Sequence, residues 1–495
     1  MSSYANRRVL IVGGGKSGLA AARYLRERGA DVVISDNRPQ PAQMEFPQTG
    51  QSETDSDGFD LVIQSPGVPL ELPIFERARA RGARIIGELE LAAEELRGRI
   101  IGVTGANGKT TTTALIGHIF QHAGRPTLIG GNIGVPVTDL VAQSTPETTV
   151  VLELSSFQLE TVETFKAQIA IVLNITPDHL DRHHTMARYI DAKARLVETQ
   201  SSDGFTILNA AEPNARALGG RTGARVVWFN LDAPSANGVA SAGGEILLGD
   251  APLMRESEIP LRGRHNVENV MAAAAAAWIV GIDSKIIAEA IRSFPGVEHR
   301  IEFVRELDGV CYYNDSKATN VDAAEKAIDA FPGGLWIILG GKDKNSDYRS
   351  LAPRLASKAK GVLLIGAAAP VIRQHLTEAD ASRRKYAVEE LTDCGPLPDG
   401  RGSVTGGSAA GGSVAGGSAA GGSVAGGSVA GAHLPEVSAS LPMTDCDTLD
   451  EAIRTARRLA APGDIVLLSP ACASFDQYQS YEHRGRCFKE LVGSL

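Results

Sequence analysis

Short runs of consecutive apolar residues recur along the chain, separated by longer segments in which apolar and polar residues mix. Val9–Val12, Leu335–Leu339 and Val362–Ile365 are such runs. Strands without a polar face are typical of sheets covered on both sides, and helix-length spacers between them favour parallel pairing. The pattern therefore predicts an α/β protein built on mainly parallel sheets.

The strand and helix pattern divides into three blocks. At 495 residues the chain is too long for one ordinary core. We expect domains at residues 1–93, 94–298 and 299–495, each with alternating strands and helices.

One stretch of the third block breaks the pattern. Residues 406–430 repeat a five-residue unit of glycine, serine, alanine and valine, inside a glycine-rich segment at about 396–435. Such a segment has too little apolar bulk to offset its ordering entropy. We predict a disordered surface insertion; a domain linker is the alternative, but the elements on both sides resemble parts of one sheet.

Composition and charge narrow the class of protein. The chain is 43% hydrophobic with a formal net charge of -9, which argues against coating nucleic acid or an anionic membrane. The start carries no signal-peptide pattern, and no apolar run approaches a membrane span. Five widely spaced cysteines without a CxxC pair indicate reduced thiols rather than a zinc site. We expect a cytoplasmic protein.

A first glycine turn, GGGKSG at residues 13–18, follows the strand Val9–Val12 and fits GxGxxG. Asp36 ends the next strand, where a dinucleotide-binding domain keeps its ribose acid. Alone, this indicates an NAD-dependent dehydrogenase. Any doubly wound domain, however, needs glycines where its first helix packs against the strand, so the match is weak evidence.

A second turn, TGANGKTT at residues 104–111, also lies between an apolar strand and a helix. Its glycines let backbone N–H groups converge on phosphate oxygens at a helix N-terminus. Lys109 can reach the β- and γ-phosphates, and the Thr110 hydroxyl can bind Mg²⁺. Val103 replaces the first glycine of the usual P-loop, but the helix-opening GKT still predicts a nucleotide site.

Two further residues follow strand ends. Glu153 ends the apolar run that starts at Val150, where an unpartnered acid would be costly, and a phosphate site needs a carboxylate for its magnesium. A salt-bridged strand-end acid is the alternative. His179 lies just beyond another strand and by itself is an ordinary loop histidine.

Seven motifs resemble the Mur ligases, and within them the branch that adds D-glutamate. The motifs are TGANGKTT (104–111), GGNIG (130–134), LELSSFQLE (152–160), NITPDHLDRH (174–183), GRHNVEN (263–269), NDSKATN (314–320) and SPACASFDQ (469–477). The resemblance covers nearly the whole chain apart from the insertion. It implies an N-terminal Rossmann-like domain for a UDP-sugar, a central P-loop ATPase-like domain, and a C-terminal Rossmann-like α/β domain for the amino acid.

The resemblance implies an ATP-dependent ligase of peptidoglycan precursor synthesis. D-glutamate would be joined to UDP-N-acetylmuramoyl-L-alanine through an acyl phosphate and a tetrahedral intermediate, giving ADP and phosphate. We expect a monomer that binds small-molecule substrates and neither nucleic acid nor membrane. The alternatives are a sister Mur ligase, a folylpolyglutamate-type ligase, the dehydrogenase, and a non-catalytic nucleotide-binding protein.

The resemblance also assigns residues on the ATP side. Thr110, Glu153, His179 and Lys193, the last as a carbamate, would hold two Mg²⁺ ions. Lys109, His179, Lys193 and Asn132 are the implied catalytic set. ATP would contact Gly105, Asn107, Gly108, Lys109, Thr110, Thr111, Asn266, Asn269, Arg300, Asp315 and Lys317.

The other two substrates have their own implied residues. The UDP-sugar would contact Lys16, Ser17, Asn37, Asn132, Ser155, Gln158 and His179. Glutamate would contact Thr319, Lys344, Ser474, Phe475 and Tyr481. Lys344 suits the side-chain carboxylate because that group needs a cation. Lys16 replaces an apolar residue common in the family, and Tyr481 replaces a common phenylalanine.

Overall fold

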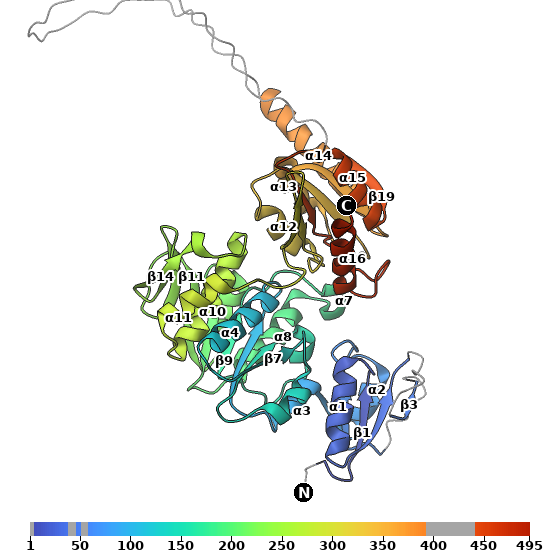
Figure 1. Cartoon of the computed structure of the whole chain (residues 1–495). Helices are drawn as coiled ribbons and strands as arrows, with labels where there is room; N and C mark the ends of the chain where they lie inside the picture. The colour runs from blue at the N-terminus through green and yellow to red at the C-terminus, as the bar shows by residue number, and fades with distance from the viewer. Residues whose placement is uncertain (1–3, 38–45, 51–57, 393–440) are drawn as a thin grey trace, which may run out of the picture.

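A computed structural model of the chain describes residues 4–37, 46–50, 58–392 and 441–495. The predicted insertion at about 396–435 lies outside the described residues. Three sheets form three units, and Figure 1 shows the central unit in contact with both the N-terminal unit in blue and the C-terminal unit in dark yellow, orange and red.

The N-terminal unit is a five-stranded, all-parallel sheet in the order β3-β2-β1-β4-β5. Alternate residues of β1 point to opposite faces, so Val9 and Ile11 pack with helix α1, while Leu10 and Val12 pack with α2. The elements are β1 (Arg8–Val12), α1 (Lys16–Glu27), β2 (Asp31–Ser35), β3 (Gln48–Thr49), β4 (Leu61–Gln64), α2 (Pro73–Ala80) and β5 (Arg84–Gly87).

The central unit has nine strands in the order β14-β13-β12-β11-β10-β9-β6-β8-β7, parallel from β7 to β12 and antiparallel beyond. Its strands are β6 (Arg99–Thr104), β7 (Thr127–Gly131), β8 (Thr149–Glu153), β9 (Ile169–Val172), β10 (Phe205–Asn209), β11 (Arg225–Leu231), β12 (Gly238–Ala242), β13 (Glu245–Leu248) and β14 (Ala251–Arg255).

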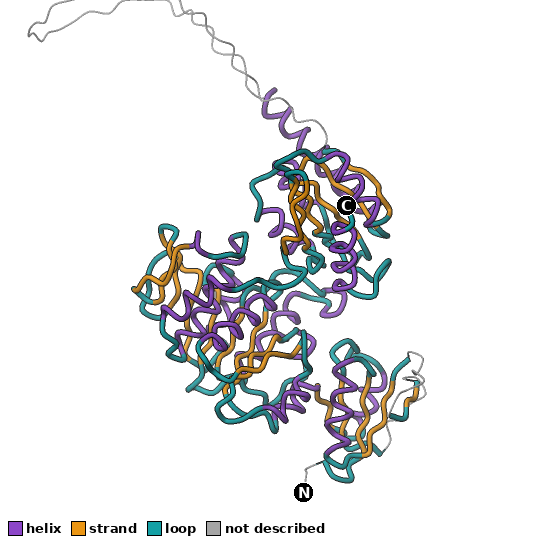
Figure 2. Tube along the Cα trace, in the orientation of Figure 1, coloured by secondary structure: helices purple, strands orange, loops and turns teal. Residues whose placement is uncertain are grey.

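Helices cover both faces of the central sheet (Figure 2). One face carries α4 (Lys109–His122), α10 (Arg264–Ile279) and α11 (Ser284–Ser293), whose alanines and aliphatic residues form one apolar cluster with the strands. The opposite face carries α3 (Glu88–Ala93), α5 (Val137–Leu140), α6 (Ser156–Leu159) and α8 (Met186–Glu198). Both faces being covered explains why the middle of β6, of β8 and of β9 is apolar.

The C-terminal unit has six strands in the order β15-β16-β20-β17-β18-β19, with β15 antiparallel to its neighbour and the rest parallel. Helices α12 (Val321–Asp329), α13 (Ala352–Lys358) and α14 (Ala369–Thr392) pack on one face, and α15 (Leu449–Leu459) and α16 (Tyr481–Gly493) on the other. The strands are β15 (Glu302–Leu307), β16 (Val310–Asn314), β17 (Leu335–Gly340), β18 (Ala359–Ile365), β19 (Met443–Asp447) and β20 (Ile465–Leu468).

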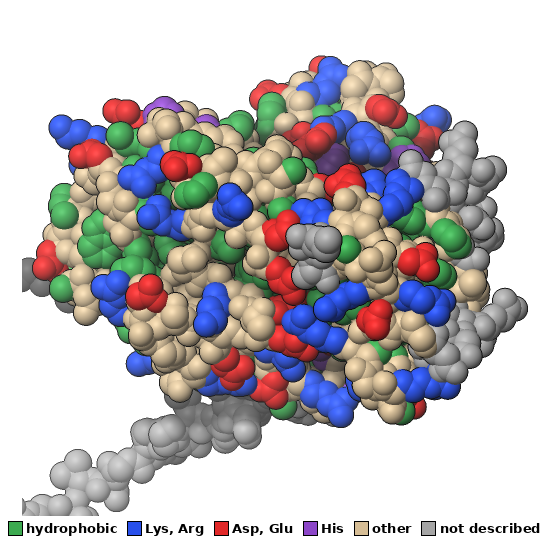
Figure 3. Space-filling view, turned by 90° about the horizontal axis from the view of Figure 1, so that it is seen from below, with side chains coloured by type: hydrophobic (Ala, Val, Ile, Leu, Met, Phe, Trp, Pro, Cys, Tyr) green, Lys and Arg blue, Asp and Glu red, His purple; other side chains and the backbone are tan. Residues whose placement is uncertain are grey.

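The observed sheets confirm the predicted α/β class. Acidic and basic side chains intersperse on the face shown in Figure 3, without a large field of one sign. No helix among the described residues is long and apolar enough to cross a membrane. The carboxyl ends of the central parallel strands meet where the three units converge, and α7 (Leu180–His183) lies at that point (Figure 1).

Candidate active site

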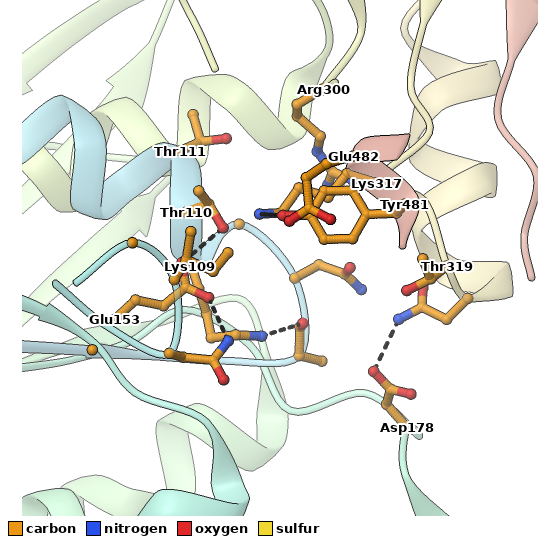
Figure 4. Close-up of a pocket in the computed structure, with 18 of the residues that line it drawn as sticks. Lys109, Thr110, Thr111, Glu153, Asp178, Arg300, Lys317, Thr319, Tyr481 and Glu482 are labelled. Carbon is orange, nitrogen blue, oxygen red and sulfur yellow. Dashed lines mark hydrogen bonds between the residues drawn. The ribbon is translucent and has the colours of Figure 1, made fainter. Parts of the chain in front are cut away.

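A cavity of about 430 Å³ lies where the three units meet. Its walls come from the start of α1, from the turn before α4, and from the C-terminal unit. Arg300, Lys317 and Tyr481 face Lys109 and Thr110 across this cavity (Figure 4). Side chains far apart in the sequence therefore share one polar site.

The turn between β6 and α4 forms a phosphate cradle. Gly108 has a left-handed φ of 88°, and a Cβ there would collide with the Asn269 side-chain oxygen. The Lys109 ammonium donates to the carbonyl oxygens of Gly105 and Ala106, each at 2.9 Å. Burial lowers the pKa of Lys109, an effect that the nearby Glu153 carboxylate opposes. The free N–H groups at the helix start and this ammonium can bind phosphate oxygens.

Glu153, at the end of β8, is 2% exposed and lies beside the cradle because β6 and β8 are neighbouring parallel strands. Its carboxylate accepts a hydrogen bond from Thr110 Oγ1 at 2.7 Å and from Asn132 Nδ2 at 3.0 Å. A carboxylate and a hydroxyl are ligands that suit Mg²⁺, which otherwise keeps water and substrate phosphates. The described residues contain no group of three His, Cys, Asp or Glu that could hold a metal ion alone.

A second lysine, Lys193 of α8, is 1% exposed and lies beneath the cradle. Its Nζ donates to the Gly105 carbonyl oxygen at 2.9 Å, the same oxygen that Lys109 contacts. Burial and the Lys109 charge lower the pKa of Lys193 well below its ordinary value. A lowered pKa favours the neutral amine, the form that reacts with CO2, so the buried position is compatible with the carbamate that the resemblance implies.

His179 precedes α7 with a left-handed φ of 54°. Its Nε2 lies 3.6 Å from Asp178 Oδ2, and burial lowers the pKa of the imidazole. The neutral ring keeps a lone pair for a ligand. Asp178 also accepts a hydrogen bond from Asn320 Nδ2 of the C-terminal unit at 3.0 Å. Neither Asp178 nor Asn320 was among the predicted residues, although Asp178 directly precedes His179 in the motif.

The C-terminal unit adds cations to the cavity. Burial lowers the pKa of Lys317 to about 8, and its Nζ lies 3.4 Å from the Tyr481 hydroxyl. Arg300 lies 3.8 Å from the Asp315 carboxylate. Asp315 is fully buried, and burial raises its pKa to about 6. In this conformation Asp315 supports Arg300 from behind and does not line the cavity.

Some of the residues predicted to contact ATP line two cavities that neighbour the central one. Asn107, Gly108, Asn269 and Arg300 line a narrow cavity beside the cradle. Asn266 receives a hydrogen bond from Asn269 at 3.0 Å and borders a different cavity next to Arg300. Sequence reasoning missed three charged or ionisable residues of the narrow cavity: His265, Glu268 and Lys326.

Five of the seven residues predicted to contact the UDP-sugar line a cavity of about 440 Å³ between the N-terminal and central units, whereas Ser155 and His179 do not line it. Lys16, Ser17, Asn37, Asn132 and Gln158 are among its walls, and Lys16 is the cationic side chain among the described residues there. Lys16 also lines the central cavity and donates to the Gly134 carbonyl across the junction.

Asp36 and Ser155 each have a local structural partner. The Asp36 carboxylate accepts a hydrogen bond from the backbone N–H of Gly14, a residue of the first glycine turn, at 2.6 Å. Ser155 is the N-cap of α6 and forms a capping box with Gln158. The S-x-x-Q spacing was a readable signal for this cap.

The five predicted glutamate residues do not share one cavity. Thr319 and Tyr481 line the central cavity, whereas Lys344 lines a neighbouring cavity of about 640 Å³. Asp178, His179 and Asn320 border both, so the two spaces adjoin at these side chains. Ser474 is buried and Phe475 is 68% exposed.

Family profiles match three successive parts of the chain. They are "Mur ligase MurD-like, N-terminal domain" at residues 7–87, "Mur ligase middle domain" at 103–277 and "Mur ligase, glutamate ligase domain" at 299–395. Among solved structures, the UDP-N-acetylmuramate-alanine ligase MurC from Thermotoga maritima aligns with a TM-score of 0.57 at 18% identity, covering 98% of this chain and 99% of that one. At this identity the likeness shows the fold.

The curated relatives have a much higher sequence identity to this chain than this solved structure. A UDP-N-acetylmuramoylalanine–D-glutamate ligase of Solibacter usitatus is 46% identical over 493 residues, covering 99% of this chain and 98% of that protein. A protein of the same name from Acidobacterium capsulatum is 44% identical over 503 residues, covering 98% and 96%. These matches confirm the family predicted from the seven motifs: the chain belongs to the Mur ligase family.

Proposed function

We propose that the protein is an ATP-dependent ligase that joins D-glutamate to UDP-N-acetylmuramoyl-L-alanine in peptidoglycan precursor synthesis, giving ADP and phosphate. The observation that carries the proposal is one cavity in which the Lys109 cradle, the Glu153–Thr110 pair and cations of the C-terminal unit converge. The choice of D-glutamate rests on the names of two relatives whose sequences are more than 40% identical to this chain.

The first step is attack of the substrate carboxylate on the γ-phosphorus of ATP. An oxygen–phosphorus bond forms to the carboxylate while the bond to the β-phosphate oxygen breaks, releasing ADP. Lys109, Arg300 and Lys317 all border the cavity and neutralise the phosphoryl oxygens. Catalysis of this step is mainly positioning and charge stabilisation.

Magnesium would be held by Glu153, Thr110, His179 and a carbamylated Lys193, where it would neutralise phosphate charge. Asn132 orients Glu153 through its 3.0 Å hydrogen bond and lines the UDP-sugar cavity as well. It therefore connects the metal side of the site with the sugar side.

The second step is attack of the glutamate amine on the acyl-phosphate carbonyl carbon. The tetrahedral intermediate collapses as the carbon–oxygen bond to phosphate breaks. Lys344 would bind the side-chain carboxylate, and its cavity adjoins the central one at Asp178 and His179. Thr319 and Tyr481 supply hydroxyl groups on the same side.

We further propose that the protein acts as a monomer in the cytoplasm. The central cavity takes its lining from all three units of the chain. The four described cysteines, Cys311, Cys446, Cys472 and Cys487, are free thiols, as a reducing compartment favours.

The test is phosphate release from ATP with UDP-N-acetylmuramoyl-L-alanine and D-glutamate, L-glutamate or no amino acid. Release that requires D-glutamate supports the proposal, and a preference for L-glutamate would replace the product. No release with either amino acid would direct attention to the sister-ligase substrates.

Replacing the cradle lysine tests the phosphate role. Lys109→Ala should lower turnover about 100- to 1000-fold, because one preorganised cation at the phosphates is lost. Lys285→Ala, at an exposed position of α11, is the matched control and should retain full turnover. Full activity of Lys109→Ala would contradict the assignment.

A further inference from the structure

Arg484 of α16 is a buried cation that the reaction described above does not use. It is 1% exposed, and its guanidinium donates to five oxygens. Nε contacts Ser316 Oγ at 3.0 Å, and Nη2 contacts the carbonyl oxygens of Ser316 at 2.9 Å and Cys472 at 3.1 Å. Nη1 makes longer contacts with the carbonyl oxygens of Gly340 and Ala473, at 3.5 and 3.4 Å.

These oxygens belong to three loops at the carboxyl ends of β16, β17 and β20. The first loop continues from Ser316 to Lys317 and Thr319, and the second from Gly340 to Lys344. The third continues from Cys472 and Ala473 to Ser474 and Phe475. The fifth glutamate candidate, Tyr481, begins the helix that carries Arg484, and its carbonyl accepts from Ser316 Oγ at 2.8 Å.

Moving a guanidinium from water into the protein interior carries a large desolvation cost. Its partners are one hydroxyl and four carbonyls, so hydrogen bonds to the surrounding loops offset the cost of burying this charge. Burial lowers the pKa of Arg484 only to about 10, so the group stays charged at neutral pH. What a guanidinium offers, and an aliphatic side chain does not, is a rigid planar fork with five donors.

One of the loops held by Arg484 has a strained backbone, and another requires a glycine. Ala471 has a left-handed φ of 59°, immediately before Cys472. Gly341 has a φ of 136°, and a Cβ there would collide with the Ala473 carbonyl oxygen and crowd the guanidinium. Non-glycine residues in the left-handed region persist where the surroundings hold them, often at functional sites. Arg484 restrains these loops through its hydrogen bonds to the carbonyl oxygens of Gly340, Cys472 and Ala473.

We infer that Arg484 is a positioning residue for the amino acid substrate, fixing the three glutamate-side loops relative to one another without touching the substrate. The inference rests on the proposed function and adds a residue to its amino acid side. Loss of the fork releases the loops, so the amino acid binds more weakly, while the UDP-sugar, whose cavity lies between the other two units, is bound as before. ATP also contacts the first loop through Lys317, so its binding weakens less than that of the amino acid. Loop displacements near 1 Å are sufficient to cost two orders of magnitude.

The test compares Arg484→Met and Arg484→Lys with wild type and with Arg486→Met, an exposed arginine of the same helix. We expect the KM for D-glutamate to rise about 10- to 100-fold in Arg484→Met and less in Arg484→Lys, which keeps the charge. The KM for UDP-N-acetylmuramoyl-L-alanine should stay within about twofold, and the KM for ATP should rise less than that for D-glutamate. All three KM values should stay within about twofold in Arg486→Met. Wild-type phosphate release that does not depend on D-glutamate refutes the proposed function itself, independently of the variants.

Two outcomes would overturn the positioning role. One is a D-glutamate KM within twofold of wild type in the Arg484 variants; where Arg484→Met does not fold, Arg484→Lys alone decides. The other is an equal rise of all three KM values, because a purely structural arginine would damage every site together. Calorimetric binding of the UDP-sugar to each variant verifies that the N-terminal and central units remain folded.

Discussion

The two junctions of the central unit are built differently. At the junction with the N-terminal unit, one apolar cluster runs from Val9 and Ile11 through Leu89 and Leu91 of α3 to Leu152 of the central sheet. At the other junction, the described apolar clusters separate: those of the C-terminal unit contain no residue before Ile301. The first junction is a shared core, and the second is not.

Polar contacts connect the central and C-terminal units. Asp322 accepts from Asn107 Nδ2 and from Thr176 Oγ1, the latter at 3.1 Å, and Asn320 donates to Asp178. The segment between the units includes two non-glycine residues with positive φ, His299 at 65° and Ile301 at 45°. A few polar contacts beside an unusual backbone are typical of a hinge.

The difference assigns different tasks to the two junctions. A shared apolar core keeps the UDP-sugar cavity in a fixed relation to the phosphate cradle, so the carboxylate to be activated is held in register with ATP. A polar junction allows the C-terminal unit to close and bring the amino acid to the acyl phosphate. Three substitutions test this contrast, beginning with the largest effect.

The largest effect is expected from Glu90→Ala at the shared core. The fully buried Glu90 carboxylate accepts from the backbone N–H groups of Glu163, Thr164 and Phe165, at 3.0, 2.7 and 3.0 Å. Alanine leaves these buried donors unsatisfied, which should lower the free energy of unfolding by about 3–5 kcal/mol. Urea unfolding measures this loss.

The matched control is Glu95→Ala, just beyond α3. Glu95 pairs with Arg28 at 2.6 Å but is 43% exposed in its side chain. Such an ion pair contributes less than about 1 kcal/mol. Equal losses in Glu90→Ala and Glu95→Ala would show that the shared core does not depend on the buried carboxylate.

A smaller effect, dependent on pH, is expected at Glu88 in the same helix. Burial raises the pKa of Glu88 to about 7. Thr138 donates twice to its Oε1, from N at 2.6 Å and Oγ1 at 2.8 Å, which leaves Oε2 for a proton. A raised pKa means that the folded state holds the proton more tightly, so this stabilisation is full below about pH 4.5 and is lost as pH rises through 7.

Glu88→Gln makes the side chain neutral at every pH and should flatten this dependence. The variant should exceed wild type in unfolding free energy at pH 8 by up to about 3 kcal/mol, and the two curves should converge toward pH 5. Urea midpoints at both pH values measure the difference. A constant offset between the two proteins across this range would contradict the assignment to Glu88.

Local features of the site could be predicted from the sequence, because short segments determine them. The strand–turn–helix at residues 104–111 predicted the cradle, and the end of the Val150 run predicted Glu153, which β6–β8 pairing places beside Thr110. Ser155 and Gln158 were predicted at the sugar, but the structure also shows that they cap α6. Local chemistry and the resemblance thus accounted for the central unit best.

Features that depend on tertiary packing were missed or incomplete. Arg484 was not among the predicted residues, and only the packing of α16 under three loops reveals its burial. The Asn320–Asp178 contact joins two sheets whose relative placement no local pattern determines. Asp315 was expected at ATP, yet it lies fully buried behind Arg300 in this conformation. The predicted glutamate residues Thr319 and Lys344 line different cavities, and this too depends on tertiary packing that a local sequence pattern does not determine.

The smallest effect on stability is expected at the polar junction, from Asp322→Ala. Asp322 accepts from Asn107 and Thr176 across the junction and also pairs with Lys326 at 2.9 Å, but these groups are only partly buried. The loss of unfolding free energy should stay below about 1 kcal/mol, since water can replace the lost contacts.

Small-angle scattering should instead show a larger radius of gyration for the ligand-free variant, and compaction of both proteins when ATP and the UDP-sugar are added together. A loss as large as that of Glu90→Ala, or no compaction in either protein, would mean that the second junction is as rigid as the first.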